Sequence, residues 1–233
     1  MEIIMVPERP FIACYVSNDL PHAITELDRR LQSGVKESQS KRAGEIMTEA
    51  SCDLIESLFG DMIDALHAAE PQSPVFIESR KVIDQIKGTL QHYLGWITGF
   101  FGNERLAPVV THFQHLLVTL DSPAGAQANL VFPVTPELAR EGRAALTALQ
   151  TGTAADAREG IETLIRFIEA GLQPLLFEPK RLLKFNFVVD KTLNGVISIT
   201  TSLGFRSLRR LGEHLPPHLH KPLADHLAQF LKD

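Results

Sequence analysis

The sequence has few cysteines, and neither of them lies in a metal-binding or redox motif. Among its 233 residues only Cys14 and Cys52 are cysteines, and no Cys-x-x-Cys spacing occurs. Two thiols this far apart indicate a reducing compartment and argue against a disulfide-stapled scaffold. No local histidine base accompanies either thiol, so both are predicted to be structural residues and not nucleophiles.

The chain also lacks the short motifs that identify a reaction. It contains no glycine-rich phosphate loop, no His-Glu-x-x-His zinc motif and no Glu-x-x-His pair of the di-iron type. No cofactor fingerprint is present, so the cofactor stays unknown. These absences favour a protein without catalysis.

Positive charge is not in excess. Lysine and arginine number 23 against 28 aspartates and glutamates, a net charge of −5 that does not favour a nucleic-acid partner. One basic cluster, Arg206, Arg209 and Arg210, lies within residues 205–211. Two interpretations are open: a solvated helix end, or a surface for nucleic acid, anionic lipid or an acidic partner.

Neither a signal peptide nor a membrane span is expected. The apolar run at the start of the sequence ends at Pro7 and follows no basic segment. The most apolar later window, residues 182–205, contains Lys184, Asp190 and Lys191. Each charge near a bilayer centre costs about 2.5–3.5 kcal/mol. We therefore expect a buried helix there and a cytoplasmic location.

The apolar residues that are present follow a helical period. They make up 44% of the chain and recur at i, i+3 and i+4, which predicts an all-α bundle of about eight helices. Short β-branched segments at 11–16 and 129–134 are predicted to be extended. The predicted helices span residues 20–33, 45–69, 75–101, 104–120, 136–151, 154–171, 180–203 and 218–231.

Local signals mark several helix ends. Ser17 and Thr135 stand where an N-cap belongs, because a side-chain oxygen there can accept a bond from a free N–H of the first turn. Gly34 and Gly152 follow two of the helices, and glycine accepts the left-handed conformation that closes a helix.

The second half of the chain echoes the first. Residues 55–58 (Ile-Glu-Ser-Leu) match 161–164 (Ile-Glu-Thr-Leu), and residues 82–84 match 188–190. These matches predict an internal duplication, with an N-terminal half at 1–122 and a C-terminal half at 129–233, joined by a linker at 121–128. The alternative is that any two amphipathic helices look alike when aligned on their leucines.

The helices at 75–101 and 180–203 are apolar nearly all round, so both are predicted to lie at the centre of the molecule. Whether the two halves share one core is left open. Asp84 and Asp190, with Asn194 one turn on, form polar stripes along these helices and could face a groove between the halves. The other interpretation is a solvated face, with Asp84 paired to Arg80 or Lys87.

Histidines and one tryptophan complete the candidate site. His112 and His226 occupy matching places in the repeat, and His115 lies near His112, so a metal site is one interpretation and helix-surface histidines are the other. Trp96 could line an aromatic pocket or belong to a core cluster.

Three hypotheses follow. The first is a non-catalytic binding or regulatory protein that holds a protein or small-molecule partner in a groove between duplicated halves. The second is a metal-assisted or carboxylate/histidine hydrolase that uses Asp84, Asp190, His112 and His226. The third is a structural subunit of a larger assembly, such as a homodimer.

Overall fold

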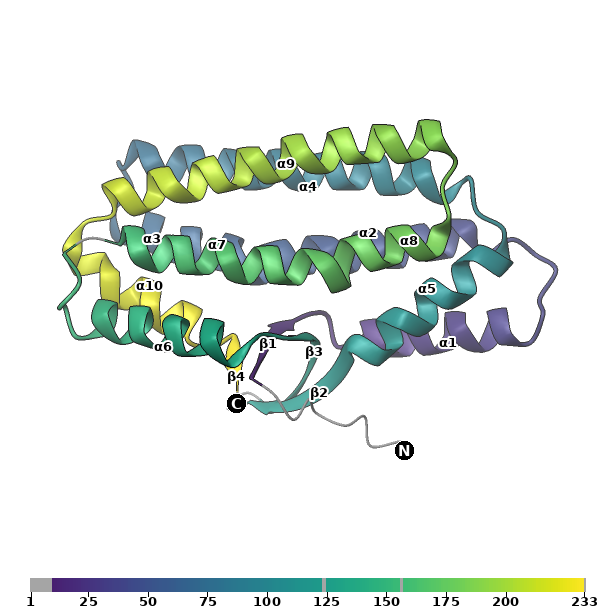
Figure 1. The fold of residues 1–233 in the computed structure, drawn as a ribbon, viewed down its shortest axis with the longest axis horizontal. Helices are drawn as coiled ribbons and strands as arrows, with labels where there is room; N and C mark the ends of the chain where they lie inside the picture. Colours follow the sequence, from purple (N-terminus) through teal and green to yellow (C-terminus); the bar gives the residue numbers. More distant parts are fainter. Residues whose placement is uncertain (1–9, 123–124, 156, 233) are drawn as a thin grey trace.

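The computed structural model describes residues 10–122, 125–155 and 157–232, and the chain is predominantly helical with one antiparallel sheet (Figure 1). The sheet corrects the all-α prediction. Its strands are β1 (Phe11–Tyr15), β2 (Leu117–Ser122), β3 (Gly125–Pro133) and β4 (Leu231–Lys232), in the order β2-β3-β1-β4. Every neighbouring pair joins a strand from before residue 123 to one from after residue 124.

The predicted linker belongs mostly to a β hairpin. Strand β2 pairs with β3 from Leu117 opposite Leu130 to Ser122 opposite Gly125, while residues 123–124 lie outside the described residues. The helix predicted to reach residue 120 therefore ends at Leu116. The small polar residues of the hairpin have a low strand propensity. The strands are stabilised instead by the pairs that their residues make across the hairpin.

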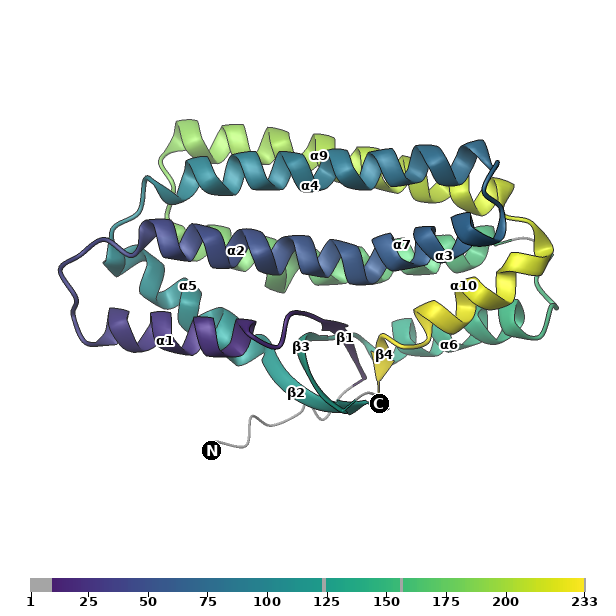
Figure 2. The same cartoon turned by 180° about the vertical axis from the view of Figure 1, so that it is seen from behind.

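The helices form layers above the sheet (Figures 1 and 2). The layer beside the sheet contains the shorter helices, the middle layer contains two long interrupted rods, and the outer layer contains the two longest helices. The layer beside the sheet is built from α1 (Leu20–Gln32), α5 (Asn103–Leu116), α6 (Pro136–Gln150), the 3-10 turn η3 (Pro217–Leu219) and α10 (His220–Leu227).

Each middle rod contains a π-helical turn. The first rod joins α2 (Ser40–Ile55), η1 (Glu56–Gly60) and α3 (Asp61–Ala69). The second joins α7 (Arg158–Leu172), η2 (Gln173–Phe177) and α8 (Glu178–Leu183). A π turn places a wider loop of backbone in the helix and is frequent at functional sites.

The outer layer contains α4 (Pro74–Thr98) and α9 (Phe187–His214), which run antiparallel. This corrects the prediction that both helices are central. One face of each helix points inward, and the opposite face is open to solvent, where Phe187, Val188 and Ile199 are strongly exposed. A left-handed residue, Lys184 (φ 48°), separates α8 from α9, so the predicted helix at 180–203 is two helices.

Some of the predicted helix ends are confirmed. The Thr135 hydroxyl accepts a hydrogen bond from the Leu138 N–H at 3.2 Å, and Gly34 and Gly152 are left-handed. Ser17 is not an N-cap, because α1 has its N-cap at Asp19, two residues later. The backbone N–H of Ser17 donates a hydrogen bond to the Asp53 carboxylate. Both cysteines are free, and burial raises the pKa of the Cys14 thiol. No described helix is both long and apolar enough to cross a membrane.

The order of elements in the first half recurs in the second: a strand, a helix, an interrupted rod, a long helix, a shorter helix and a strand. The residue matches do not fall at equivalent points of this order. Residues 55–58 straddle the junction of α2 and η1, whereas residues 161–164 lie in the first turns of α7. Asp84 lies mid-way along α4, whereas Asp190 lies in the first turn of α9.

Candidate functional site: apolar cavities between the helix layers

The central cavity lies between the middle and outer layers and has a volume of about 270 Å³. Its walls come from both halves of the chain. The first half contributes α2, η1, α3 and α4, and the second contributes α7, η2 and α9, with Phe132 of β3 at the sheet side. Representative lining residues are Leu58, Phe59, Val82, Leu175, Val196 and Thr200.

A second space, the side cavity, lies next to the central cavity, toward α5 and α8, and has a volume of about 160 Å³. The two cavities share wall residues, including Leu54, Leu90 and Val196. Together they follow the length of the outer helices. Within the described residues Lys180 is the only charged side chain that lines either cavity.

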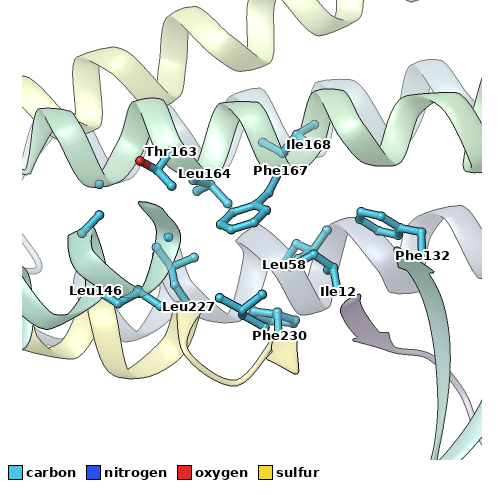
Figure 3. Close-up of a pocket in the computed structure, with 14 residues that line it drawn as sticks. Ile12, Leu58, Phe132, Leu146, Thr163, Leu164, Phe167, Ile168, Leu227 and Phe230 are labelled. Atoms are coloured by element: carbon cyan, nitrogen blue, oxygen red, sulfur yellow. The ribbon is translucent and has the colours of Figure 1, made fainter. Parts of the chain in front are cut away.

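A third and smaller cavity of about 50 Å³ lies on the sheet side of α7 (Figure 3). Phe167 points from α7 toward Leu227 and Phe230 across this space (Figure 3). The Phe167 ring fits here because residue 142 is a glycine: a Cβ at Gly142 would come within 2.5 Å of the ring. Leu58 and Phe132 line both this cavity and the central one.

Both π turns line the central cavity. Leu58 and Phe59 come from η1, and Leu175 and Leu176 come from η2. The wider turn changes the helical phase at the middle of each rod, so that successive apolar residues point into one space. Irregular backbone from both halves thus borders the same cavity.

Each π turn is hydrogen-bonded by a histidine from the other half. His112 of α5 bonds the carbonyl oxygen of Pro174 in η2 at 2.7 Å, and His226 of α10 bonds that of Leu58 in η1 at 3.3 Å. The structure thus places the two sequence-matched histidines in corresponding contacts. Burial lowers the pKa of His226, a shift that outweighs the opposing effect of its bond to Leu58.

An ion-pair network fastens η1 to the outer layer. The Glu56 carboxylate accepts from Arg80 at 2.7 Å and from Lys87 at 2.5 Å, both on α4. Burial opposes ionisation of Glu56, but these two cations outweigh it and lower the pKa of the carboxyl. Asp84, predicted to face a groove, is exposed and lies 3.5 Å from Arg80.

Asp190 and Asn194 do come together. Lys180 on α8 lies 2.6 Å from Asp190, and the Asn194 amide donates to the same carboxylate at 3.0 Å. Asp190 therefore holds Lys180 at the border of the side cavity. The structure does not bring Asp84 into this cluster, since the ion-pair partners of the two aspartates belong to different elements.

The basic cluster of α9 is largely neutralised. Arg209 pairs with Glu162 of α7 at 2.7 Å and Arg210 with Glu78 of α4 at 2.6 Å, while Arg206 is exposed. These pairs link α9 to its two neighbours. Trp96 is partly exposed at the other end of the outer layer, edge-on to Tyr93 and Phe100.

Metal-ligating side chains do not gather in the described residues: no group of three or more histidine, cysteine, aspartate or glutamate side chains could hold an ion. The chain matches no protein-family model, no curated protein and no solved structure. Function must therefore be argued from the cavities and the side chains around them.

Sequence reasoning missed the apolar wall and Lys180. An apolar residue that lines a cavity has the same helical spacing as one in a filled core, so periodicity does not distinguish them. The predicted helices stop at residue 171 and resume at 180, and the prolines at 174 and 179 are the local signals of the irregular turn at η2.

Proposed function

We propose that this protein binds one elongated apolar molecule, such as a fatty acyl chain, in the central and side cavities. This places the partner between the two halves, as the first hypothesis from the sequence expected. The support is that two adjacent apolar cavities with shared wall residues follow the outer helices, and that Lys180 lies at the border of the side cavity.

The volume of the cavity supports a resident ligand. At about 24 cal/mol per Å³, a fully enclosed and unfilled space of this volume would cost about 6.5 kcal/mol of stability, which is an upper bound for this partly open cavity. That is comparable to the whole unfolding free energy of many domains, about 5–15 kcal/mol. Apolar cavities of this kind take up apolar molecules in preference to water. A bound chain would restore the contacts that the wall residues otherwise lack.

Lys180 supports an anionic head group at one end of the ligand. Its ammonium has three hydrogen-bond donors, and Asp190 occupies one direction at 2.6 Å. The side chain is only 17% exposed, so a carboxylate beside it would interact in a partly desolvated setting. The chain would then extend past Val196, which lines both cavities, toward the π turns.

Binding of the fluorescent fatty acid cis-parinaric acid tests the proposal. We expect saturable binding with one site per chain. Val196→Phe should weaken it by tenfold or more because the ring occupies shared wall space, whereas Ile199→Phe, one turn away on the solvent face of α9, should leave it unchanged. Unsaturable binding, or equal effects of the two variants, would overturn the proposal.

The proposed contact between Lys180 and an anionic head group is tested separately. Lys180→Gln should weaken cis-parinaric acid but leave its methyl ester unaffected, because only the acid carries a charge. Lys81→Gln, an exposed lysine on α4, should change neither. Loss of both ligands in Lys180→Gln would show that the lysine holds the helices and not the head group.

Duplication is part of the same proposal: the two halves, 1–122 and 129–233, are taken as copies of one unit whose junction forms the cavity. The repeated order of elements and the crossed histidine contacts support it. The hydrolase hypothesis has less support, because Asp84, Asp190, His112 and His226 each contact different partners.

A further inference from the structure

One end of the outer layer carries an exposed apolar patch. Phe187 and Val188, at the start of α9, are 79% and 71% exposed, and Trp96 and Phe100, at the end of α4, are 42% and 53% exposed. Both views place the end of α4 and the start of α9 at the same end of the molecule (Figures 1 and 2). We define these four residues as the aromatic end.

The two helix ends are fixed to each other. The Phe101 and Phe185 rings, each next to this patch in sequence, lie 5.2 Å apart. At the opposite end Arg210 of α9 pairs with Glu78 of α4, which sets the antiparallel register. The aromatic end is therefore one surface built by both long helices, and it is not the frayed tip of either.

The charge around this patch is positive although the whole chain is negative. Lys191 lies one turn after Phe187 on the same face of α9, and Lys184 precedes the helix; both are exposed and have no ion-pair partner in the described part of the chain. Two of the nearby carboxylates are paired, Asp190 with Lys180 and Glu178 with Arg181.

We propose that the aromatic end docks onto an anionic membrane surface. Tryptophan and phenylalanine on an exposed apolar helix face enter the lipid interface, and lysines beside them are attracted to acidic head groups. The combination of exposed aromatics and unpaired lysines, in a chain of net charge −5, fits an anionic bilayer better than an acidic protein, which would offer little to Phe187 and Val188.

The docking surface also borders the cavity. Tyr93, which packs edge-on against Trp96, lines the side cavity, and so do Ile97 and Phe185. Docking would bring this border to the level of the lipid chains, where an acyl ligand could be exchanged. This exchange role rests on the proposed function, but the docking itself does not, because it involves only the outside of the molecule.

Trp96 is the only tryptophan in the chain, so its fluorescence reports on this surface alone. We expect a blue shift, and quenching by brominated acyl chains, with vesicles of phosphatidylcholine and phosphatidylglycerol. Phosphatidylcholine alone should give a much weaker response. Raising the salt from about 0.1 M to 1 M should weaken the binding, since the screening length falls from about 10 Å to about 3 Å.

Variants of exposed residues separate the apolar contribution to vesicle binding from the contribution of the lysines. Phe187→Ser with Val188→Ser should reduce vesicle binding about tenfold or more, measured by cosedimentation. Lys184→Gln and Lys191→Gln should each reduce it about fivefold. Ile199→Ser, a matched control that is 72% exposed farther along α9, should not change it.

Three results would overturn the docking proposal. These are no binding to anionic vesicles, equal binding to neutral ones, or a dimer in light scattering that Phe187→Ser with Val188→Ser converts to a monomer. The last would assign the patch to a second copy of the chain. Vesicle binding without cis-parinaric acid binding would support docking and overturn the cavity proposal. Binding of cis-parinaric acid without vesicle binding would support the cavity proposal and overturn docking.

Discussion

The ring of His112 bonds the carbonyl oxygen of Pro174 at 2.7 Å and so joins α5, in the first half, to the π turn η2 in the second. Pro174 lies where the backbone departs from the α-helical pattern, so its carbonyl needs a partner from outside the helix. We therefore expect this hydrogen bond to stabilise the folded protein.

Replacing His112 by alanine should destabilise the protein. The Pro174 carbonyl would lose its partner in a half-buried place, at a cost of about 1–3 kcal/mol. His115→Ala is the matched control, because His115 lies on the same helix and is exposed; its change should stay within about 0.5 kcal/mol. Urea unfolding followed by circular dichroism measures both. Equal losses in the two variants would contradict this role for His112.

Stability should fall on mild acidification because of His226. Burial holds the pKa of this histidine below its ordinary value of 6.5, so the unfolded chain binds the proton more readily than the folded one. Titration of His226 therefore leaves the unfolding free energy unchanged above about pH 6.5. The unfolding free energy decreases as the pH falls from 6.5 toward the pKa of His226 in the folded protein. His226→Gln should flatten the decrease between about pH 7.5 and 5.5. An unchanged slope in the variant would assign the effect to other groups.

Two glycine-to-alanine changes should have opposite signs. A Cβ at Gly195 meets nothing within 4 Å, so Gly195→Ala should stabilise α9 by about 0.5–1 kcal/mol through helix propensity. A Cβ at Gly171 would lie 2.8 Å from the Phe132 ring, so Gly171→Ala should destabilise by about 1–3 kcal/mol. Thermal unfolding distinguishes them. Stabilisation by both would show that Phe132 moves aside freely.

Filling the central cavity should stabilise the ligand-free protein. Thr200 lines this cavity, and Thr200→Leu would add apolar volume there, worth about 1 kcal/mol. The same variant should gain less unfolding free energy on adding cis-parinaric acid, a gain that in the wild type is about 2.7 kcal/mol when the free ligand is at a hundred times Kd. Ser202→Leu, on the exposed face of α9, is the control. Destabilisation by Thr200→Leu would indicate that the walls already touch.

Local signals predicted local structure well. The cap at Thr135 and the left-handed glycines at 34 and 152 follow from side-chain chemistry within one turn, and all three are confirmed. Strand β2 was missed because it is held by pairing with β3. The spacing of apolar residues in the sequence gives no information about that pairing. The pattern of α4 and α9 was interpreted as central burial. In fact one face of each helix lines cavities and the other meets solvent.

The site itself could be predicted only in part. The correspondence of His112 and His226 is visible in the sequence, but their acceptors are backbone carbonyls, which leave no trace in residue identity. Lys180 escaped notice because its importance comes from the position of α8 beside the side cavity. Asp190 and Asn194 were recognised as one stripe, and their partner on α8 was not.

The strand order has a consequence for how the molecule is made. Among the described strands, β1 bonds only β3 and β4, and β2 bonds only β3, so each strand pairs only with strands from the other half of the chain. A nascent chain that has emerged up to β2 carries two lone strands, and such edges invite pairing with other molecules. Strand β3 can pair with β1 and β2 once it has emerged, whereas β4 can join β1 only when Leu231 reaches Ile12, so the last edge of the sheet forms after residue 231 has been synthesised.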